Sequence, residues 1–252
     1  MTALFPNDLG VWLLLAFGVF VVGLSKTGIP GIGILFVAIF ASIFPARLST
    51  GIALPLLIVA DLVAIRRFRG KTVWSHVWKL IPPSFAGVVV GYYSMKYLND
   101  SSAGFWIGIL ILLMVVLHFF RKALPNWQPH QAGVALFFGF TSGIVTMIAN
   151  AAGPLVTLYL LEMKLKKEEF MGTGAWFYLM MNCVKVPFGL SLGIIHSQTL
   201  FLDFVFVPIL LLGAWWGGRI NHRISQNWFE WGAIGFAAIA ALRLIVVNWL
   251  TN

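Results

Sequence analysis

Charged residues are scarce in this chain of 252 residues, where Asp, Glu, Lys and Arg together make up 10%. Soluble globular domains carry roughly 25% charged residues. The hydrophobic share is 60%, and the mean hydropathy is +0.92. This composition excludes an ordinary soluble domain and predicts a protein of the lipid bilayer.

Cysteine is almost absent, since the chain has only Cys183, which lies inside an apolar run. A single cysteine excludes an internal disulfide framework and a zinc or iron–sulfur site built on cysteines. The 5 histidines are spread over separate loops and helix ends, without the spacing of metal ligands. We therefore expect neither a metal nor a cofactor.

Acidic residues are scarcer than basic ones, with 8 Asp and Glu against 17 Lys and Arg, for a net charge of +9. In a soluble protein, such an excess would favour nucleic acid as a partner. Here the basic residues lie in short loops between apolar runs, where they mark the cytoplasmic side of a membrane protein. The expected partners are thus the lipid bilayer and a small solute, with no nucleic acid.

Ten apolar runs divide the chain into two sets of five. Residues 1–124 hold a pair of short runs within 9–44 and longer runs at 48–65, 77–97 and 103–120. Residues 125–252 hold a short pair within 132–163 and longer runs at 170–195, 199–218 and 228–250. Because a spanning helix needs about 20 residues, each short pair is predicted to be two half-helices, either re-entrant or fully crossing.

The two sets share a pattern of glycine and proline that indicates an internal duplication. One constant offset relates Pro82, Gly87 and Gly91 to Pro208, Gly213 and Gly217, and nearly the same offset relates Pro30 to Pro154. Chance is the alternative, because both residue types are frequent in membrane helices.

Loop charges predict the orientation of the chain. If each short pair enters and returns on one side, one side holds Arg66, Arg67, Arg69, Lys71, Lys79, Arg121, Lys122, Lys164, Lys166, Lys167, Arg219 and Arg223. The other side then holds only Arg47 and Lys96. This asymmetry marks the cytoplasm, whereas one broken span per pair would divide the charges almost evenly.

Both termini are therefore expected outside the cytoplasm. Because each set has an odd number of segments, the second set runs inverted relative to the first. The predicted fold is an all-α polytopic membrane protein of two inverted repeats, whose half-helix pairs meet near the midplane. This pattern is typical of transporters.

A polar segment from Gly23 to Gly33 interrupts the first short pair. Its residues of interest are Ser25, Lys26, Thr27, Gly28, Pro30 and Gly31. A lysine at membrane depth needs a compensating partner or a watery cavity. Pro30 suits the first position of a helix, whose free N–H groups would join the lysine and the hydroxyls in an anion site. Alternatively, Lys26 extends to the membrane interface and the glycines only allow close packing.

The second repeat carries a similar polar interruption without a charge, formed by Thr146, Asn150, Gly153 and Pro154. In an inverted arrangement its helix start meets that of the first repeat, so both would point at one ligand. A simple helix cap is the alternative role for Asn150.

The run 170–195 adds a second deep cation, Lys185, with Asn182 and with Pro187, which is placed to kink the helix. We expect Asp61 to be the only carboxylate well inside an apolar run. Its position near Arg66 fits a local ion pair and a proton carrier equally.

Three stretches resemble the TauE/SafE family of sulfite and organosulfonate exporters: Gly23 to Gly33, Thr141 to Pro154, and Trp176 to Pro187. The likeness extends over nearly the whole chain, including its length and its two-repeat layout. More distant members have a denser run of glycines at the position of 28–33, and many lack a lysine there, which indicates a branch with its own substrate preference.

The resemblance implies export of a small sulfur-containing anion, such as sulfite or sulfoacetate, across a bacterial inner membrane without ATP hydrolysis. Our hypothesis is alternating access, with the anion held by Ser25, Lys26, Thr27, Thr146, Asn150, Asn182 and Lys185. The alternatives are an inward permease for another small anion and a membrane assembly protein that carries no solute. An enzyme is not expected, because the sequence shows neither a nucleophile with its base nor a metal cluster. A homodimer is compatible with the sequence.

Overall fold

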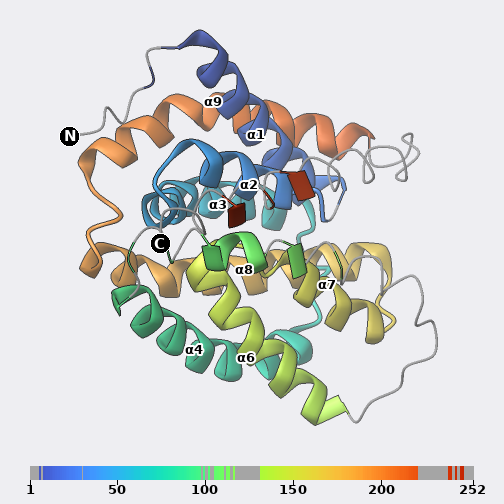
Figure 1. Cartoon of the computed structure of the whole chain (residues 1–252). Helices are drawn as coiled ribbons and strands as arrows, with labels where there is room; N and C mark the ends of the chain where they lie inside the picture. Colours follow the sequence, from blue (N-terminus) through green and yellow to red (C-terminus); the bar gives the residue numbers. More distant parts are fainter. Residues whose placement is uncertain are drawn as a thin grey trace.

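The chain is described from a computed structural model, which covers residues 6, 8–29, 31–97, 99, 102, 105–110, 112–113, 116, 131–220, 238–239, 242 and 245–246. The helices with defined bounds are α1 (Leu9–Thr27), α2 (Ile34–Ile43), α3 (Ala46–Arg67), α4 (Trp74–Tyr97), α6 (Gln131–Ala149), α7 (Gly153–Glu162), α8 (Lys167–Ser191) and α9 (Ser197–Ile220). No strand occurs in this part of the chain, so the all-α prediction is confirmed (Figure 1). Pro30 and most of the predicted runs 103–120 and 228–250 lie outside the described residues.

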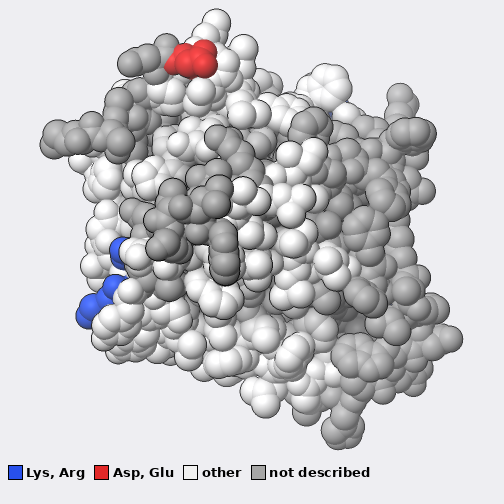
Figure 2. All heavy atoms as spheres, viewed as in Figure 1, with Lys and Arg blue, Asp and Glu red and all other residues white. Residues whose placement is uncertain are grey.

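Within the described part of the chain, three helices, α1, α3 and α9, are long and apolar enough to cross a membrane. Many large apolar side chains are exposed on the outer surface, among them Leu136, Phe204 and Leu212. Figure 2 shows a face on which most of the described residues are uncharged. Such a surface is stable against lipid and unfavourable in water, as expected for a membrane protein.

The first member of each short pair is longer than predicted. Helix α1 has 19 residues and ends at Thr27, and α6 also has 19, whereas α2 and α7 have 10 each. The half-helix prediction therefore fails by length for α1, which is long enough to cross a membrane, whereas the apolar part of α6 and helices α2 and α7 are shorter. In α1 the helix continues through the polar residues because Thr27 Oγ1 donates a hydrogen bond to the carbonyl oxygen of Ala214, at 2.6 Å.

Helices α1 and α2 form an antiparallel hairpin. Gly18 faces the side chain of Ile39, and further along the chain Ser25 Oγ accepts a hydrogen bond from the Gly33 amide at 3.1 Å. The turn between them contains Gly31 at φ 98°, a conformation that side chains with a Cβ rarely adopt. The hairpin places the end of α1 beside the start of α2.

Two helix pairs, α1 with α9 and α4 with α6, make close contacts through glycine (Figure 1). A Cβ atom on Gly87 would overlap the carbonyl oxygen of Phe140, and one on Gly213 would overlap that of Phe20. Likewise, a Cβ atom on Gly23 would overlap the carbonyl oxygen of Leu210, and one on Gly143 would overlap that of Ser84. The two pairs thus use corresponding residues, as a duplication predicts; the inverted arrangement of the repeats stays a prediction.

The loop between α3 and α4 meets the start of α8 at one end of the bundle. Lys71 Nζ lies 2.8 Å from Glu168 Oε2, and the hydrogen bond and charge of Glu168 raise the pKa of Lys71. The Val73 amide donates to Thr173 Oγ1, and Arg67 donates to the carbonyl oxygen of Gly218 at the end of α9. Several residues predicted to face the cytoplasm therefore lie close together.

Candidate functional site

A cavity of about 100 Å³ lies where the two short pairs approach each other, between α1, α2, α3, α6, α7 and α8. Its wall includes Ile34 and Gly153, the first residues of α2 and α7. The first turn of a helix has unpaired N–H groups and a partial positive charge. Both helix ends face one space, but the amides of Ile34 and Leu35 at the start of α2 already donate to the carbonyl oxygens of Gly31 and Ile32, so α2 contributes the positive end of its dipole.

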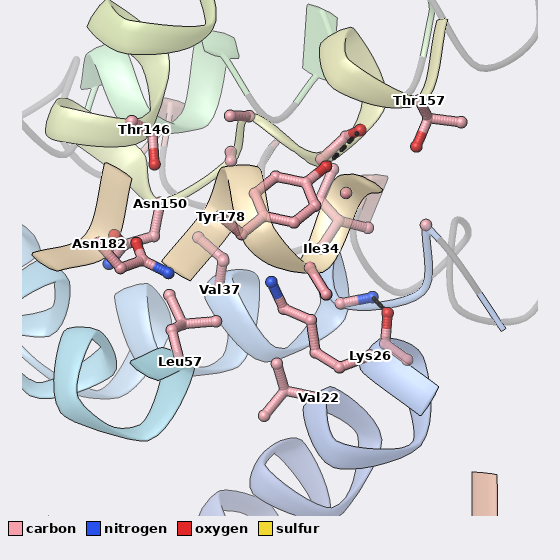
Figure 3. Close-up of a pocket in the computed structure, with 18 of the residues that line it drawn as sticks. Val22, Lys26, Ile34, Val37, Leu57, Thr146, Asn150, Thr157, Tyr178 and Asn182 are labelled. Carbon is pink, nitrogen blue, oxygen red and sulfur yellow. Dashed lines mark hydrogen bonds between the residues drawn. The ribbon is translucent and has the colours of Figure 1, made fainter. Parts of the chain in front are cut away.

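Seven of the predicted site residues line this cavity: Ser25, Lys26, Gly31, Thr146, Asn150, Gly153 and Asn182. They come from segments far apart in the sequence, at the end of α1, the turn before α2, the end of α6, the start of α7 and the middle of α8. Figure 3 shows the Lys26 side chain extending into the cavity toward the Tyr178 ring, with Asn150 and Asn182 at one side.

Lys26 is held by an ion pair and by an aromatic ring. Its Nζ lies 2.6 Å from Asp61 Oδ1 and 4.0 Å from the centroid of the Tyr178 ring. The Lys26 side chain is 15% exposed, whereas that of Asp61 is fully buried. Since a charge in an apolar interior is stable only when paired, each of the two ions depends on the other.

Asp61 corrects two expectations from the sequence. It pairs with Lys26 across the bundle rather than with Arg66, and its Oδ2 accepts a hydrogen bond from Asn182 Nδ2 at 2.8 Å. It is also not the only deep carboxylate, because Asp203 in α9 is 3% exposed. Asp203 was not predicted to be a deep carboxylate, although it lies within the apolar run 199–218.

Lys185 lies behind the cavity wall instead of on it. Its side chain is 2% exposed, and its ammonium donates to Thr146 O at 3.0 Å, Thr146 Oγ1 at 3.1 Å, Asn182 Oδ1 at 3.1 Å and Asn150 Oδ1. Both amide oxygens are thereby fixed toward Lys185, and the amide nitrogens point elsewhere. Asn150 Nδ2 donates to the carbonyl oxygen of Thr50 at 2.8 Å. Lys185 thus orients the polar wall and adds a positive charge beneath it.

Two hydroxyl groups on the cavity wall are free to donate to a ligand. Ser25 Oγ already accepts a hydrogen bond from the Gly33 amide, and Thr146 Oγ1 accepts one from Lys185. Because a hydroxyl both accepts and donates, each keeps a proton that an anion in the cavity can receive. The Tyr178 hydroxyl instead donates to the carbonyl oxygen of Gly153 at 3.2 Å.

Thr27 and Gly28, predicted as ligands, lie against α9 and do not line the cavity. Thr27 is fully buried and hydrogen-bonded to α9, and a Cβ on Gly28 would meet the backbone of Gly217. These residues allow α1 to approach α9 closely. At Gly28 this contact favours the close-packing alternative.

The other residues predicted at helix breaks lie at the end of α6, at the start of α7 and inside α8. Asn150 adopts a left-handed backbone conformation at φ 52°, and its backbone N–H donates to Thr146 O at 3.0 Å. It therefore ends α6 and does not cap α7. Pro154 is the second residue of α7, close to the predicted first position. Pro187 lies inside α8, which continues to Ser191.

Thr157 and Tyr178 belong to the cavity wall but were not among the predicted ligands. Thr157 follows Gly153 by four residues, which places both on one face of α7. From this spacing, Thr157 could have been predicted to lie on the same side of the site as Gly153. Tyr178 could not be chosen over its neighbours, since Phe177 is buried elsewhere in the core and Trp176 packs against Trp74 at 5.1 Å.

Comparison with known proteins supplies a family for this arrangement. The model of the family described as Sulfite exporter TauE/SafE matches residues 14–244, which is nearly the whole chain. Neither the curated proteins nor the solved structures include a significant match.

Proposed function

Because the chain belongs to the sulfite exporter TauE/SafE family of membrane transporters, we propose that it exports a small organosulfonate or sulfite from the cytoplasm, with the cavity as its binding site. The family implies a sulfite- or sulfonate-type anion. The site, the direction and an alternating-access mechanism are proposed here.

The observation that carries the proposal is the set of donors around one cavity. Lys26, the hydroxyls of Ser25 and Thr146 and the first residues of α2 and α7 all line it. The oxygens of a sulfonate group need several donors at once, and an ammonium together with two hydroxyl groups supplies them, while the dipole ends of α2 and α7 add positive potential.

The charge of the site also favours an anion. Lys26 and Asp61 form an ion pair, and Lys185 donates to three oxygens that can only accept, those of the Thr146 carbonyl and of the Asn150 and Asn182 amides, as an ammonium with three protons does. The site thus holds two positive charges and one negative charge. The buried group is therefore net positive by one charge while the cavity is empty. A negative ligand compensates this charge in a space that water screens poorly.

The cavity wall also has an apolar part, with Val22, Val37, Leu57 and Leu160. A ligand with a short carbon chain beside its sulfonate group would bury that chain against these side chains. This division favours a small organosulfonate over sulfate, which has polar oxygens on every side.

Export agrees with the electrical gradient of a cell. An inside-negative potential contributes roughly 2.3 kcal/mol per charge per 100 mV to an anion that leaves the cytoplasm. Uptake of the same anion would oppose this term.

Binding to the purified protein in detergent tests the site. Sulfite, methanesulfonate, sulfoacetate, sulfate and chloride are titrated against the wild type, the double variant Lys26→Met/Asp61→Asn and the control Lys79→Met. We expect a sulfur-containing anion to bind the wild type and the control, and to bind the double variant at least tenfold more weakly. Equal binding to all three proteins would exclude the cavity as the site.

A further inference from the structure

Resting on the proposed transport function, we propose that Asp61 is an internal counter-ion that the transported anion displaces from Lys26. Asp61 binds one proton when it is displaced, so that anion and proton cross together. The site then takes a dianion, such as a sulfonate that carries a second acidic group, in company with one proton.

Lys26 is the cation of the cavity, and in the structure its ammonium is already occupied. Asp61 Oδ1 lies 2.6 Å from Lys26 Nζ, whereas Asp61 itself is absent from the cavity wall. A sulfonate oxygen in the cavity would compete with this carboxylate for the same ammonium. Binding of the anion therefore weakens the ion pair.

Once the ion pair with Lys26 is weakened, few other groups can stabilise the negative charge of Asp61. It is fully buried, and its other oxygen accepts one hydrogen bond from the neutral amide of Asn182. An ionised carboxylate that loses its cation in an apolar interior is neutralised by a proton. Proton uptake on Asp61 is thus the expected consequence of anion binding at Lys26.

The groups that face Asp61 come mainly from two helices. Lys26 lies on α1, and Asn182, Lys185, Tyr178 and Cys183 lie on α8. Helices α2 and α6 carry no charged residue between their bounds. No other carboxylate among these groups can take the proton instead.

Helix α9 also packs on α3 and contributes Asp203 and Arg219. Trp12 contacts Phe206, near Asp203, with ring centroids 5.5 Å apart, whereas Lys26 lies 14 positions further along α1. At about 1.5 Å per residue, the helix places the two carboxylates toward different levels of the bundle. Arg219 lies over the Trp215 ring at 3.7 Å. Asp203 therefore offers a matched control for Asp61.

Charge balance then selects the ligand. With Asp61 protonated, Lys26 and Lys185 leave two positive charges at the site, which two negative charges on the ligand balance. A dianion that crosses with one proton still carries one net negative charge outward, so the membrane potential continues to favour export.

Proton uptake can be counted by titration calorimetry in buffers of different ionisation enthalpy. Sulfoacetate is the probe because its carboxyl, like other carboxyls, ionises at about pH 4, so its own charge stays constant from pH 6 to pH 8. We expect the wild type and Asp203→Asn to take up about one proton per sulfoacetate bound at pH 7. Their affinity should fall by up to about tenfold per pH unit as the pH rises, as the linkage of one proton requires.

Two Asp61 variants complete the test. Asp61→Glu keeps the carboxyl and should still take up a proton, whereas Asp61→Asn should take up none and bind sulfoacetate equally well at pH 6 and pH 8. If the wild type binds the probe without proton uptake, the counter-ion role is wrong and the proposed function stands. If no sulfur-containing anion binds the wild type, the proposed function fails and this inference with it.

Discussion

Lys26 and Asp61 form a buried ion pair, and at the scale of single residues this pair controls both stability and the charge of the cavity. Its two members come from α1 and α3, and Asn182 from α8 extends it. Three helices thus share one polar contact inside an apolar bundle.

Removing only the cation should destabilise the protein. In Lys26→Met, Asp61 stays buried without its partner, and we expect the free energy of unfolding to fall by about 3–5 kcal/mol. The double variant Lys26→Met/Asp61→Asn removes both charges and should recover most of that loss. Denaturant unfolding in detergent measures both values. A double variant that is less stable than Lys26→Met would contradict the pairing.

The sequence predicted the polar residues of the cavity better than their partners. Lys26, Asn150 and Asn182 stand out because polar groups are rare in apolar runs. For Asp61 the sequence left a local ion pair with Arg66 and a proton carrier equally open, because separation along the sequence was the only available guide. Its true partner is 35 positions away, and only the packing of α1 against α3 brings them together.

At the scale of helices, glycine determines how closely α4 approaches α6 and α9 approaches α1. Gly87 and Gly213 lie against backbone carbonyl groups of α6 and α1, where a methyl group cannot fit without moving a helix. Gly133 in α6 has no atom within 4 Å of the position of a Cβ. Gly133 therefore serves as a control for substitutions at Gly87 and Gly213.

Alanine at these positions should have opposite effects. We expect Gly87→Ala and Gly213→Ala each to lower the stability by about 1–3 kcal/mol through overpacking. Gly133→Ala should leave it unchanged or raise it by up to about 1 kcal/mol, since alanine favours helix. Thermal unfolding in detergent compares the three variants. Equal effects at all three positions would exclude the close contacts.

The lengths of the helices in the short pairs were harder to predict than their existence. A lysine and two hydroxyls normally mark the end of a membrane helix, so α1 was expected to stop before them. In the structure Thr27 donates to α9 and Lys26 is paired with Asp61, so these residues are accommodated within the helix. Such compensation depends on neighbours that the sequence does not reveal.

At the scale of the whole molecule, the distribution of basic residues predicts which end of the bundle faces the cytoplasm. Helix α4 has 24 residues, so about 36 Å separate its two ends. Lys71 precedes this helix and Lys96 lies in its last turn. The two lysines therefore report on opposite sides of the membrane.

Single cysteines can test this orientation in a Cys183→Ser background. In intact cells, we expect a membrane-impermeant maleimide to label Lys96→Cys and to label Lys71→Cys only after the cells are opened. Labelling of Lys71→Cys alone in intact cells would reverse the orientation, and with it the outward position of the termini.

Flux into proteoliposomes tests most directly whether the cavity at Lys26 carries a sulfur-containing anion. The wild type, Lys26→Met/Asp61→Asn and the control Lys79→Met are reconstituted side by side, and the uptake of sulfite and sulfoacetate is followed with sulfate and chloride as comparisons. We predict saturable flux of a sulfur-containing anion through the wild type and the control, and at least a tenfold loss in the double variant. Undiminished flux through the folded double variant, or no flux of any of these anions through the wild type, would contradict the proposed site and function.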